Sequence, residues 1–94
     1  MEKDIEKKLK EAVKAVDGIA LKFVSPSYNG MPDRIVLMPK GRIGFVETKD
    51  RGKKPRALQR TRHKQLRMLG FKVFTLDRPE QIEKIIKEIG GDDT

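Results

Sequence analysis

The stretch DRIVLMPKGRIGFVETK, from Asp33 to Lys49, decides the fold of this 94-residue chain. Two mostly apolar runs, residues 33–39 and 42–49, flank a short Lys-Gly connection. Apolar runs of this length are typical of β-strands, and a short turn that contains glycine joins such strands into an antiparallel hairpin. The stretch therefore predicts a hairpin whose two outer ends, near Asp33 and Lys49, lie side by side.

The segments on either side of this hairpin also predict regular structure. Apolar residues three or four positions apart predict amphipathic helices, and short apolar runs between turn residues predict strands. The expected helices span 2–16, 56–69 and the segment from 78 onwards, and the further strands span 19–25 and 71–77. A strand that follows a helix needs a crossover connection, which favours some parallel pairing. We therefore predict an α/β fold, a small mixed sheet of about four strands flanked by helices in the order αβββαβα, in a single domain over 1–94 with a frayed tail at 90–94.

Positive charge is concentrated in one segment. The chain holds 22 Lys and Arg against 14 Asp and Glu, a net charge of +8. Residues 49–67 contain nine of the basic residues and one acid, so this segment alone accounts for the whole excess. A localised basic segment favours a polyanion such as nucleic acid, because phosphate contacts release condensed counterions. The alternative is a solvated surface helix; a membrane surface is less favoured, since large aromatic anchors are missing.

The composition excludes several classes of site. No cysteine is present, which excludes disulfides and thiolate metal sites, and the single histidine, His63, excludes a zinc site built from several histidines of one chain. No apolar run reaches the roughly 18 residues that a membrane-spanning helix needs, and no signal peptide opens the sequence. We therefore expect a cytoplasmic protein without membrane contact.

The polar residues of the hairpin form the candidate site. Counting across the Lys-Gly turn places Asp33 opposite a position near residue 48, so that Glu47 and Lys49 flank it. Glu47 and Lys49 share one face of their strand with Phe45, and we expect a helix to cover that face. Two neighbouring carboxylates repel each other unless a cation lies between them, and oxygen ligands favour Mg²⁺ or Mn²⁺. The alternative is a surface Glu–Lys pair at a strand end, with Asp33 capping a turn.

Short motifs in a fixed order carry a resemblance to a known family. The sequence GMPD at 30–33, followed after thirteen residues by ETK at 47–49, is similar to the PD-(D/E)xK signature of nucleases. The full pattern resembles the VRR-NUC family, the virus-type replication-repair nucleases, over nearly the whole chain. It consists of an acidic first helix, LKF at 21–23, GMPDRIVLMP at 30–39, FVETK at 45–49, Leu-Gln at 58–59 and GFKVFTLD at 70–77. The resemblance implies a restriction-endonuclease-like core.

The resemblance also implies roles for individual residues. Asp33 and Glu47 would bind a Mg²⁺ or Mn²⁺ ion through their carboxylate oxygens, and the backbone carbonyl of Thr48 would complete the protein ligands. Thr48 stands where the family commonly has a hydrophobic residue, but a carbonyl ligand does not depend on the side chain. Lys49 would position or activate the attacking water, and Gln59 would orient Lys49 or the scissile phosphate.

An acidic residue on the first helix is implied as a further, water-mediated contact to the site. Two residues, Glu2 and Glu6, compete for this role. At 100° per residue, Glu2 lies about 40° from the centre of the apolar stripe of the helix, and Glu6 lies about 75° from it. We therefore favour Glu2, although a terminal turn that frays would hold a metal poorly.

The basic segment supplies the predicted DNA contacts. Like charges four residues apart on one helix face repel each other, and a phosphate backbone along that face would relieve the repulsion. The predicted DNA-binding residues are Lys53, Lys54, Arg56, Arg60, Lys64 and Arg67. On the same helix we expect His63 to be a bystander or a groove contact, and Leu58, Leu66 and Leu69 to face the core.

The predicted function is that of a metal-dependent, structure-selective DNA endonuclease that hydrolyses phosphodiester bonds in DNA repair. Short stand-alone members of the family resemble Holliday-junction resolvases. A four-way junction offers two strands to cut, so we expect a homodimer with two sites, encoded by a bacterium or a phage. Four isoleucines between Ile82 and Ile89 could contribute apolar surface to the dimer. The alternatives are a catalytically idle nucleic-acid-binding module and a general, non-specific DNA nuclease.

Overall fold

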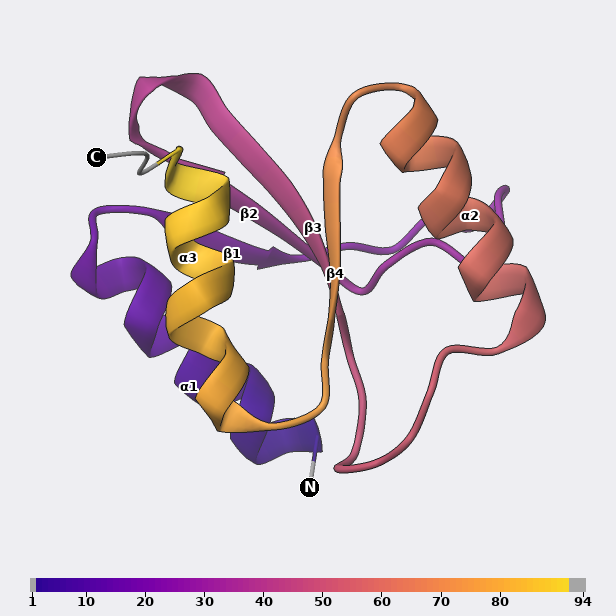
Figure 1. Cartoon of the computed structure of the whole chain (residues 1–94), viewed down its shortest axis with the longest axis horizontal. Helices are drawn as coiled ribbons and strands as arrows, with labels where there is room; N and C mark the ends of the chain where they lie inside the picture. Colours follow the sequence, from indigo (N-terminus) through magenta and orange to yellow (C-terminus); the bar gives the residue numbers. More distant parts are fainter. Residues whose placement is uncertain (1, 92–94) are drawn as a thin grey trace.

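Within residues 2–91, which this computed structural model describes, three α-helices and four β-strands form the fold (Figure 1). The helices are α1 (Glu2–Ala15), α2 (Ala57–Met68) and α3 (Ile82–Gly90), and the strands are β1 (Ile19–Lys22), β2 (Arg34–Met38), β3 (Arg42–Thr48) and β4 (Lys72–Leu76). The strands make one sheet in the order β1-β2-β3-β4, antiparallel except for the parallel pair of β3 and β4. The predicted α/β fold with a mixed sheet is confirmed.

The larger hydrophobic core lies on one face of the sheet, under α1 and α3. Figure 1 shows these two helices on one side of the sheet and α2 on the other. Ten buried apolar side chains meet under α1 and α3. They are Ile5, Leu9, Val13, Ala20, Val36, Val46, Leu76, Ile82, Ile85 and Ile89. Gly44 of β3 permits this close packing, because a Cβ atom at that position would lie only 2.6 Å from Ile89.

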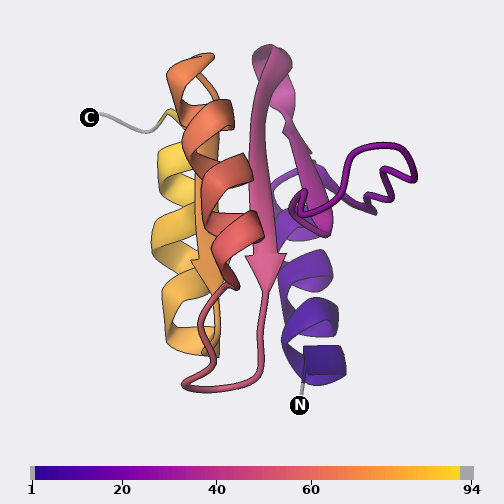
Figure 2. The same ribbon diagram turned by 90° about the vertical axis from the view of Figure 1, so that its right-hand side faces the viewer.

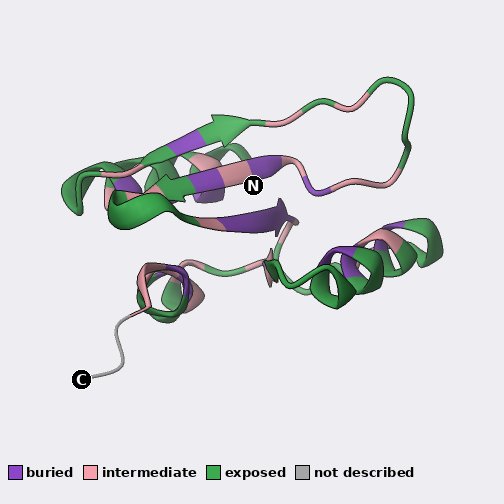
Figure 3. Cartoon of the chain, turned by 90° about the horizontal axis from the view of Figure 1, so that it is seen from above, coloured by how far each residue is buried: buried purple, intermediate pink, exposed green. Residues whose placement is uncertain are grey.

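Helix α2 covers only part of the opposite face. Seen from the side of α2, the helix lies over β4 and beside β3 (Figure 2). Its core is small and consists of Leu66 packed with Phe45 and Val73. The apolar residues of this face on β1 stay exposed, and Ile19 and Leu21 are 56% and 46% exposed. The burial colours in Figure 3 show the same incomplete cover of the sheet. Strand β3 is buried over most of its length, whereas β1 is exposed at both ends.

The hairpin turn differs from the predicted one by a residue. A three-residue 3-10 turn, Pro39–Gly41, replaces the two-residue Lys-Gly connection, and its last two residues have left-handed backbone with φ of 68° and 72°. The longer turn shifts the strand register, so that Arg34 pairs with Val46. Continuing this pairing by one residue places Asp33 opposite Glu47, and the predicted partner near residue 48 is wrong.

The predicted apolar face of α2 is also wrong in part. Leu66 is buried as expected, but Leu58 and Leu69 are 45% and 73% exposed. The buried face runs instead through Gln59, His63 and Leu66, which have the i, i+4, i+7 spacing of a single helix face. His63, which we expected to be a bystander or a groove contact, is thus buried on this face.

The ends of β1 and α3 differ most from the prediction, whereas the other elements differ by a single residue at an end. The surface of α3 differs as well. Strand β1 ends at Lys22 instead of continuing to residue 25. Helix α3 includes Gly90, and Gly91 caps it in a left-handed conformation with a φ of 67°. The helix thus enters the predicted tail, of which residues 92–94 lie outside the described residues. Three of the four isoleucines of α3 pack in the larger core, so they are not available to a second copy.

Candidate active site

Asp33 is held at the start of β2 by the last residue of β3. The backbone N–H of Thr48 donates to Asp33 Oδ1 at 3.0 Å and to Oδ2 at 3.3 Å, and the Thr48 hydroxyl donates to Oδ2 at 2.6 Å. The Thr48 side chain is fully buried. Each carboxylate oxygen has two lone-pair sites, so these bonds fix the Asp33 carboxylate and still leave acceptor capacity for a ligand.

Glu47 lies buried between β3 and α2 with one oxygen bonded and one free. The Gln59 amide Nε2 donates to Glu47 Oε2 at 3.0 Å, and Lys49 Nζ lies 3.4 Å from the same oxygen. Glu47 Oε1 is buried and has no hydrogen-bond partner within the described part of the chain. An unpaired, buried carboxylate oxygen is costly, so it indicates a place where a further positive group is missing.

The carboxyl groups of Asp33 and Glu47 disfavour each other's negative charge, as the sequence predicted. Burial and the nearby Asp33 charge raise the pKa of Glu47 from 4.5 to about 7, and Lys49 opposes this rise. Burial also raises the pKa of Asp33, against the hydrogen bonds from Thr48. Without a cation the pair therefore tends to keep a proton, and a divalent ion would favour the fully charged state.

Gln59 is oriented by both ends of its amide. Its Oε1 accepts a hydrogen bond from the backbone N–H of Arg56 at 2.8 Å, which turns its Nε2 toward Glu47. Gln59 is therefore linked to Lys49 through Glu47, because Gln59 donates to Oε2 of that carboxylate and Lys49 forms an ion pair with the same oxygen.

The two acidic residues of α1 that compete for the site, Glu2 and Glu6, lie in different surroundings. Glu6 accepts hydrogen bonds from Arg34 at 2.7 and 3.2 Å, and Arg34 is itself buried. Glu2 instead lines a cleft of about 330 Å³ together with Lys49. The remaining lining residues of this cleft are Asp50, Lys53, Lys54 and Arg56. Both acids act on the pair electrostatically, since Glu2 raises the pKa of Glu47 and Glu6 that of Asp33.

The predicted DNA-binding residues divide between two hollows and the open surface of α2. Lys53, Lys54 and Arg56 line the cleft that contains Lys49. Lys54 also lines a second hollow together with Arg60 and Arg67. Lys64 is exposed on the same helix. Five of the six predicted residues thus line one of these two hollows, and Lys64 lies on the open surface.

Three contributors to this region were missed by sequence reasoning. The Thr48 hydroxyl binds Asp33, Arg34 holds Glu6, and His63 is buried beside Gln59. A signal existed for His63, because it follows Gln59 at helical spacing. Thr48 and Arg34 had a weaker signal, because each is only a hydrophilic residue in a mostly apolar strand.

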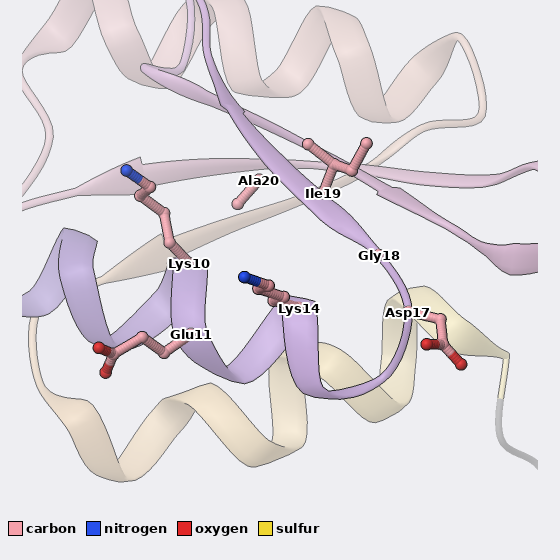
Figure 4. Close-up of a pocket in the computed structure, with 7 residues that line it drawn as sticks. All are labelled: Lys10, Glu11, Lys14, Asp17, Gly18, Ile19 and Ala20. Atoms are coloured by element: carbon pink, nitrogen blue, oxygen red, sulfur yellow. The ribbon is translucent and has the colours of Figure 1, made fainter.

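Another hollow, of about 630 Å³, lies at the far edge of the sheet between α1 and β1 (Figure 4). Its floor is Gly18, Ile19 and Ala20, and charged side chains of both signs surround it. The predicted site residues do not line it. Its mixed charge gives no reason to assign chemistry there.

Comparison with known proteins agrees with the geometry. No family model matches the chain. Over 76 residues, 81% of its length, the chain is 49% identical to the "Putative nuclease p44" of Acyrthosiphon pisum secondary endosymbiont phage 1, of which it covers 82%. A solved structure described as a VRR_NUC domain has a TM-score of 0.85 and 34% identity, over 92% of this chain and 94% of that structure. These likenesses define the class of protein as a nuclease. Within that class, the chain belongs to the VRR-NUC family.

Within residues 2–91, no helix is long and apolar enough to cross a membrane.

Proposed function

We propose that this nuclease is a DNA endonuclease that depends on Mg²⁺ or Mn²⁺. The observation that carries the proposal is that Asp33 and Glu47 meet at one end of the hairpin, where Glu47 Oε1 is buried and has no hydrogen-bond partner among residues 2–91. Hard divalent ions take carboxylate and carbonyl oxygens as ligands. The residues present therefore fit such an ion.

The ligands would be the carboxylates of Asp33 and Glu47 and the backbone carbonyl of Thr48. Among the described residues, no group of three or more His, Cys, Asp or Glu side chains could hold a metal ion. Two carboxylates are nevertheless compatible with Mg²⁺, which usually keeps several waters and takes other ligands from a substrate phosphate. A bound ion would lower the pKa of water and neutralise charge on the phosphate.

The remaining polar residues act around this pair. Lys49 holds a positive charge 3.4 Å from Glu47 and at the cleft, where it can orient water or stabilise the charge that develops on the phosphate. Gln59 holds the Glu47 carboxylate in place. Glu2 lines the same cleft as Lys49, which supports it over Glu6 as the acidic helix residue.

DNA is held through its phosphates rather than its bases. The proposed contacts are Lys53, Lys54, Arg56, Arg60, Lys64 and Arg67, which lie on α2 and in the loop before it. Such contacts carry affinity without reading sequence, so substrate choice must depend on the shape of the DNA.

We further propose a homodimer that cuts four-way junctions in the cytoplasm of a bacterial host, where the DNA of a phage would be repaired. The support is an uncovered apolar row across the sheet, in which Ile19 pairs with Leu37 and Leu37 with Ile43. Ile19 and Leu37 are 56% and 38% exposed. A symmetric dimer would bury this row and provide one site for each of two strands.

Incubation with four-way, flap and linear DNA tests this function. We expect cleavage with Mg²⁺ or Mn²⁺, none with EDTA, and preference for the four-way junction by a dimer in light scattering. Cleavage in EDTA would contradict the metal site. Equal cleavage of linear duplex by a monomer would contradict the resolvase and leave a general DNA nuclease.

A further inference from the structure

The second basic hollow lies between α2 and β4, next to the carboxylate pair. It has a volume of about 320 Å³ and is lined by Lys54, Pro55, Arg60, His63, Arg67 and Thr75. Three of these residues are cations. Thr75 pairs directly with Glu47 across β3 and β4, so one lining residue of the hollow lies about one strand spacing, ~4.8 Å, from the backbone of Glu47.

The burial of His63, which lines this hollow, is not explained by packing alone. Its side chain is 2% exposed, yet its Nε2 has no hydrogen-bond partner among the described residues. Buried polar atoms nearly always have a partner, so an orphaned one indicates a missing water, ion or ligand. Burial, Arg67 and Lys49 lower the pKa of His63, so the ring is neutral and has one N–H to donate.

The two arginines are already fixed in the wall of the hollow. Arg60 Nη1 donates to the Pro55 carbonyl at 2.7 Å, and Arg67 Nη2 donates to the Val73 carbonyl at 2.9 Å. A guanidinium has five N–H donors, so each arginine keeps further donors for an anion. Lys54 lines both this hollow and the cleft of Lys49 and therefore connects the two.

From these observations we infer that the hollow is a binding site for a DNA backbone phosphate near the one that is cut. The strand then runs from the cleft of Lys49, past Lys54, along the β4 side of α2. The other side of α2 is less free to bind, because Arg62 donates to the Asn29 carbonyl at 2.7 Å and covers the Tyr28 ring at 3.8 Å. This inference rests on the proposed DNA substrate but not on catalysis.

The single histidine of the chain makes the test direct, since its imidazole ring gives one set of proton NMR signals. The protein is titrated in EDTA with inorganic phosphate, with a short single-stranded oligonucleotide that lacks terminal phosphates, and with chloride at matched ionic strength. We expect the His63 signals to shift saturably with phosphate and with the oligonucleotide, but not with chloride. A response to inorganic phosphate alone would overturn the DNA site, as would the absence of any response.

Variants separate this site from general charge. Lys54→Ala lies in the exposed loop, so it removes one contact without disturbing the core, and Arg60→Ala removes a second. Each should weaken the shift of the His63 signals and lower the log–log salt slope of oligonucleotide binding by about 0.7. The matched control is Lys84→Ala, an exposed lysine on α3, which should change neither. Equal effects of all three variants would overturn the site.

The NMR result is independent of cleavage. If the protein cleaves DNA while the His63 signals stay unmoved, the phosphate site is wrong and the nuclease function stands. If those signals respond but no substrate is cut, the site stands and the proposed catalysis fails.

Discussion

The face of the sheet under α1 and α3 and the face under α2 differ in what they bury. The first buries ten apolar side chains in one continuous core. The second buries three apolar side chains together with Glu47, Gln59 and His63. Burying polar groups costs free energy unless each finds a partner. The fold thus obtains its stability from one face and keeps ionisable groups in a poorly solvated setting on the other.

The largest change in stability is expected on the first face. Leu9→Ala removes a fully buried side chain between α1 and the sheet, and should lower the free energy of unfolding by about 2–5 kcal/mol. The control Leu69→Ala lies at the C-cap of α2, at a residue 73% exposed, and should change it by less than about 0.5 kcal/mol. Urea unfolding measures both values, and similar losses would contradict the contrast between the faces.

The second face should make stability depend on pH when no metal is bound. In the folded protein the pKa of Glu47 is about 7, whereas the ordinary pKa of a glutamate side chain is 4.5. Between these values the folded state binds more protons, so the free energy of unfolding falls as pH rises, by roughly 2–3 kcal/mol for Glu47. The raised pKa of Asp33 acts in the same direction, and the lowered pKa of His63 acts in the opposite one.

Glu47→Gln isolates this contribution. In EDTA, the variant should lose less stability between pH 5 and 8 than the wild type, as measured by thermal unfolding at each pH. Adding Mn²⁺ at pH 8 should restore the wild type but not the variant. A wild type that becomes more stable than Glu47→Gln as pH rises in EDTA would contradict the raised pKa.

The sequence predicted the first face better than the second. The apolar spacing in α1 and α3 matched their buried residues except at Val16, which lies beyond α1 and is exposed, because a core of aliphatic side chains leaves a periodic pattern. The same reasoning failed for α2, where Leu58 and Leu69 are exposed and Gln59 and His63 are buried. Hydrophobic periodicity cannot find a helix face that packs through polar groups, since those groups are buried by their partners and not by their own hydrophobicity.

The sequence predicted that the polar residues of the hairpin lie close together, but not their detailed geometry. Asp33, Glu47 and Lys49 meet because antiparallel strands return to the same end, and this follows from the hairpin alone. The predicted register of β2 and β3 was wrong by one residue. Nothing about a lysine at position 40 indicates the left-handed backbone that this residue adopts in the turn. The Thr48 hydroxyl was missed because only the three-dimensional arrangement of β2 and β3 brings it to Asp33.

Thr48→Val tests how the carboxylate of Asp33 is held beside the second face. Valine has the same shape but lacks the hydroxyl that donates to Asp33 at 2.6 Å, and the loss should lower the free energy of unfolding by about 1–2 kcal/mol. Calorimetric titration with Mn²⁺ should show weaker binding by the variant, because one Asp33 oxygen is no longer held. Thr48→Ser keeps the hydroxyl and should bind Mn²⁺ like the wild type. If the valine variant binds Mn²⁺ as tightly as the wild type, the Thr48 hydroxyl does not contribute to metal binding by holding Asp33.

The most direct measurement of the central claim is cleavage of a four-way junction in Mg²⁺ by the wild type, Asp33→Asn and Glu47→Gln, with DNA binding measured in parallel. Both substitutions keep the size of the side chain and remove its charge from the carboxylate pair. Each variant should cut at least ~100-fold more slowly and bind the junction as well as the wild type, because the basic residues on and before α2 are unchanged. Cleavage by either variant at the rate of the wild type would contradict a nuclease site built from these two carboxylates.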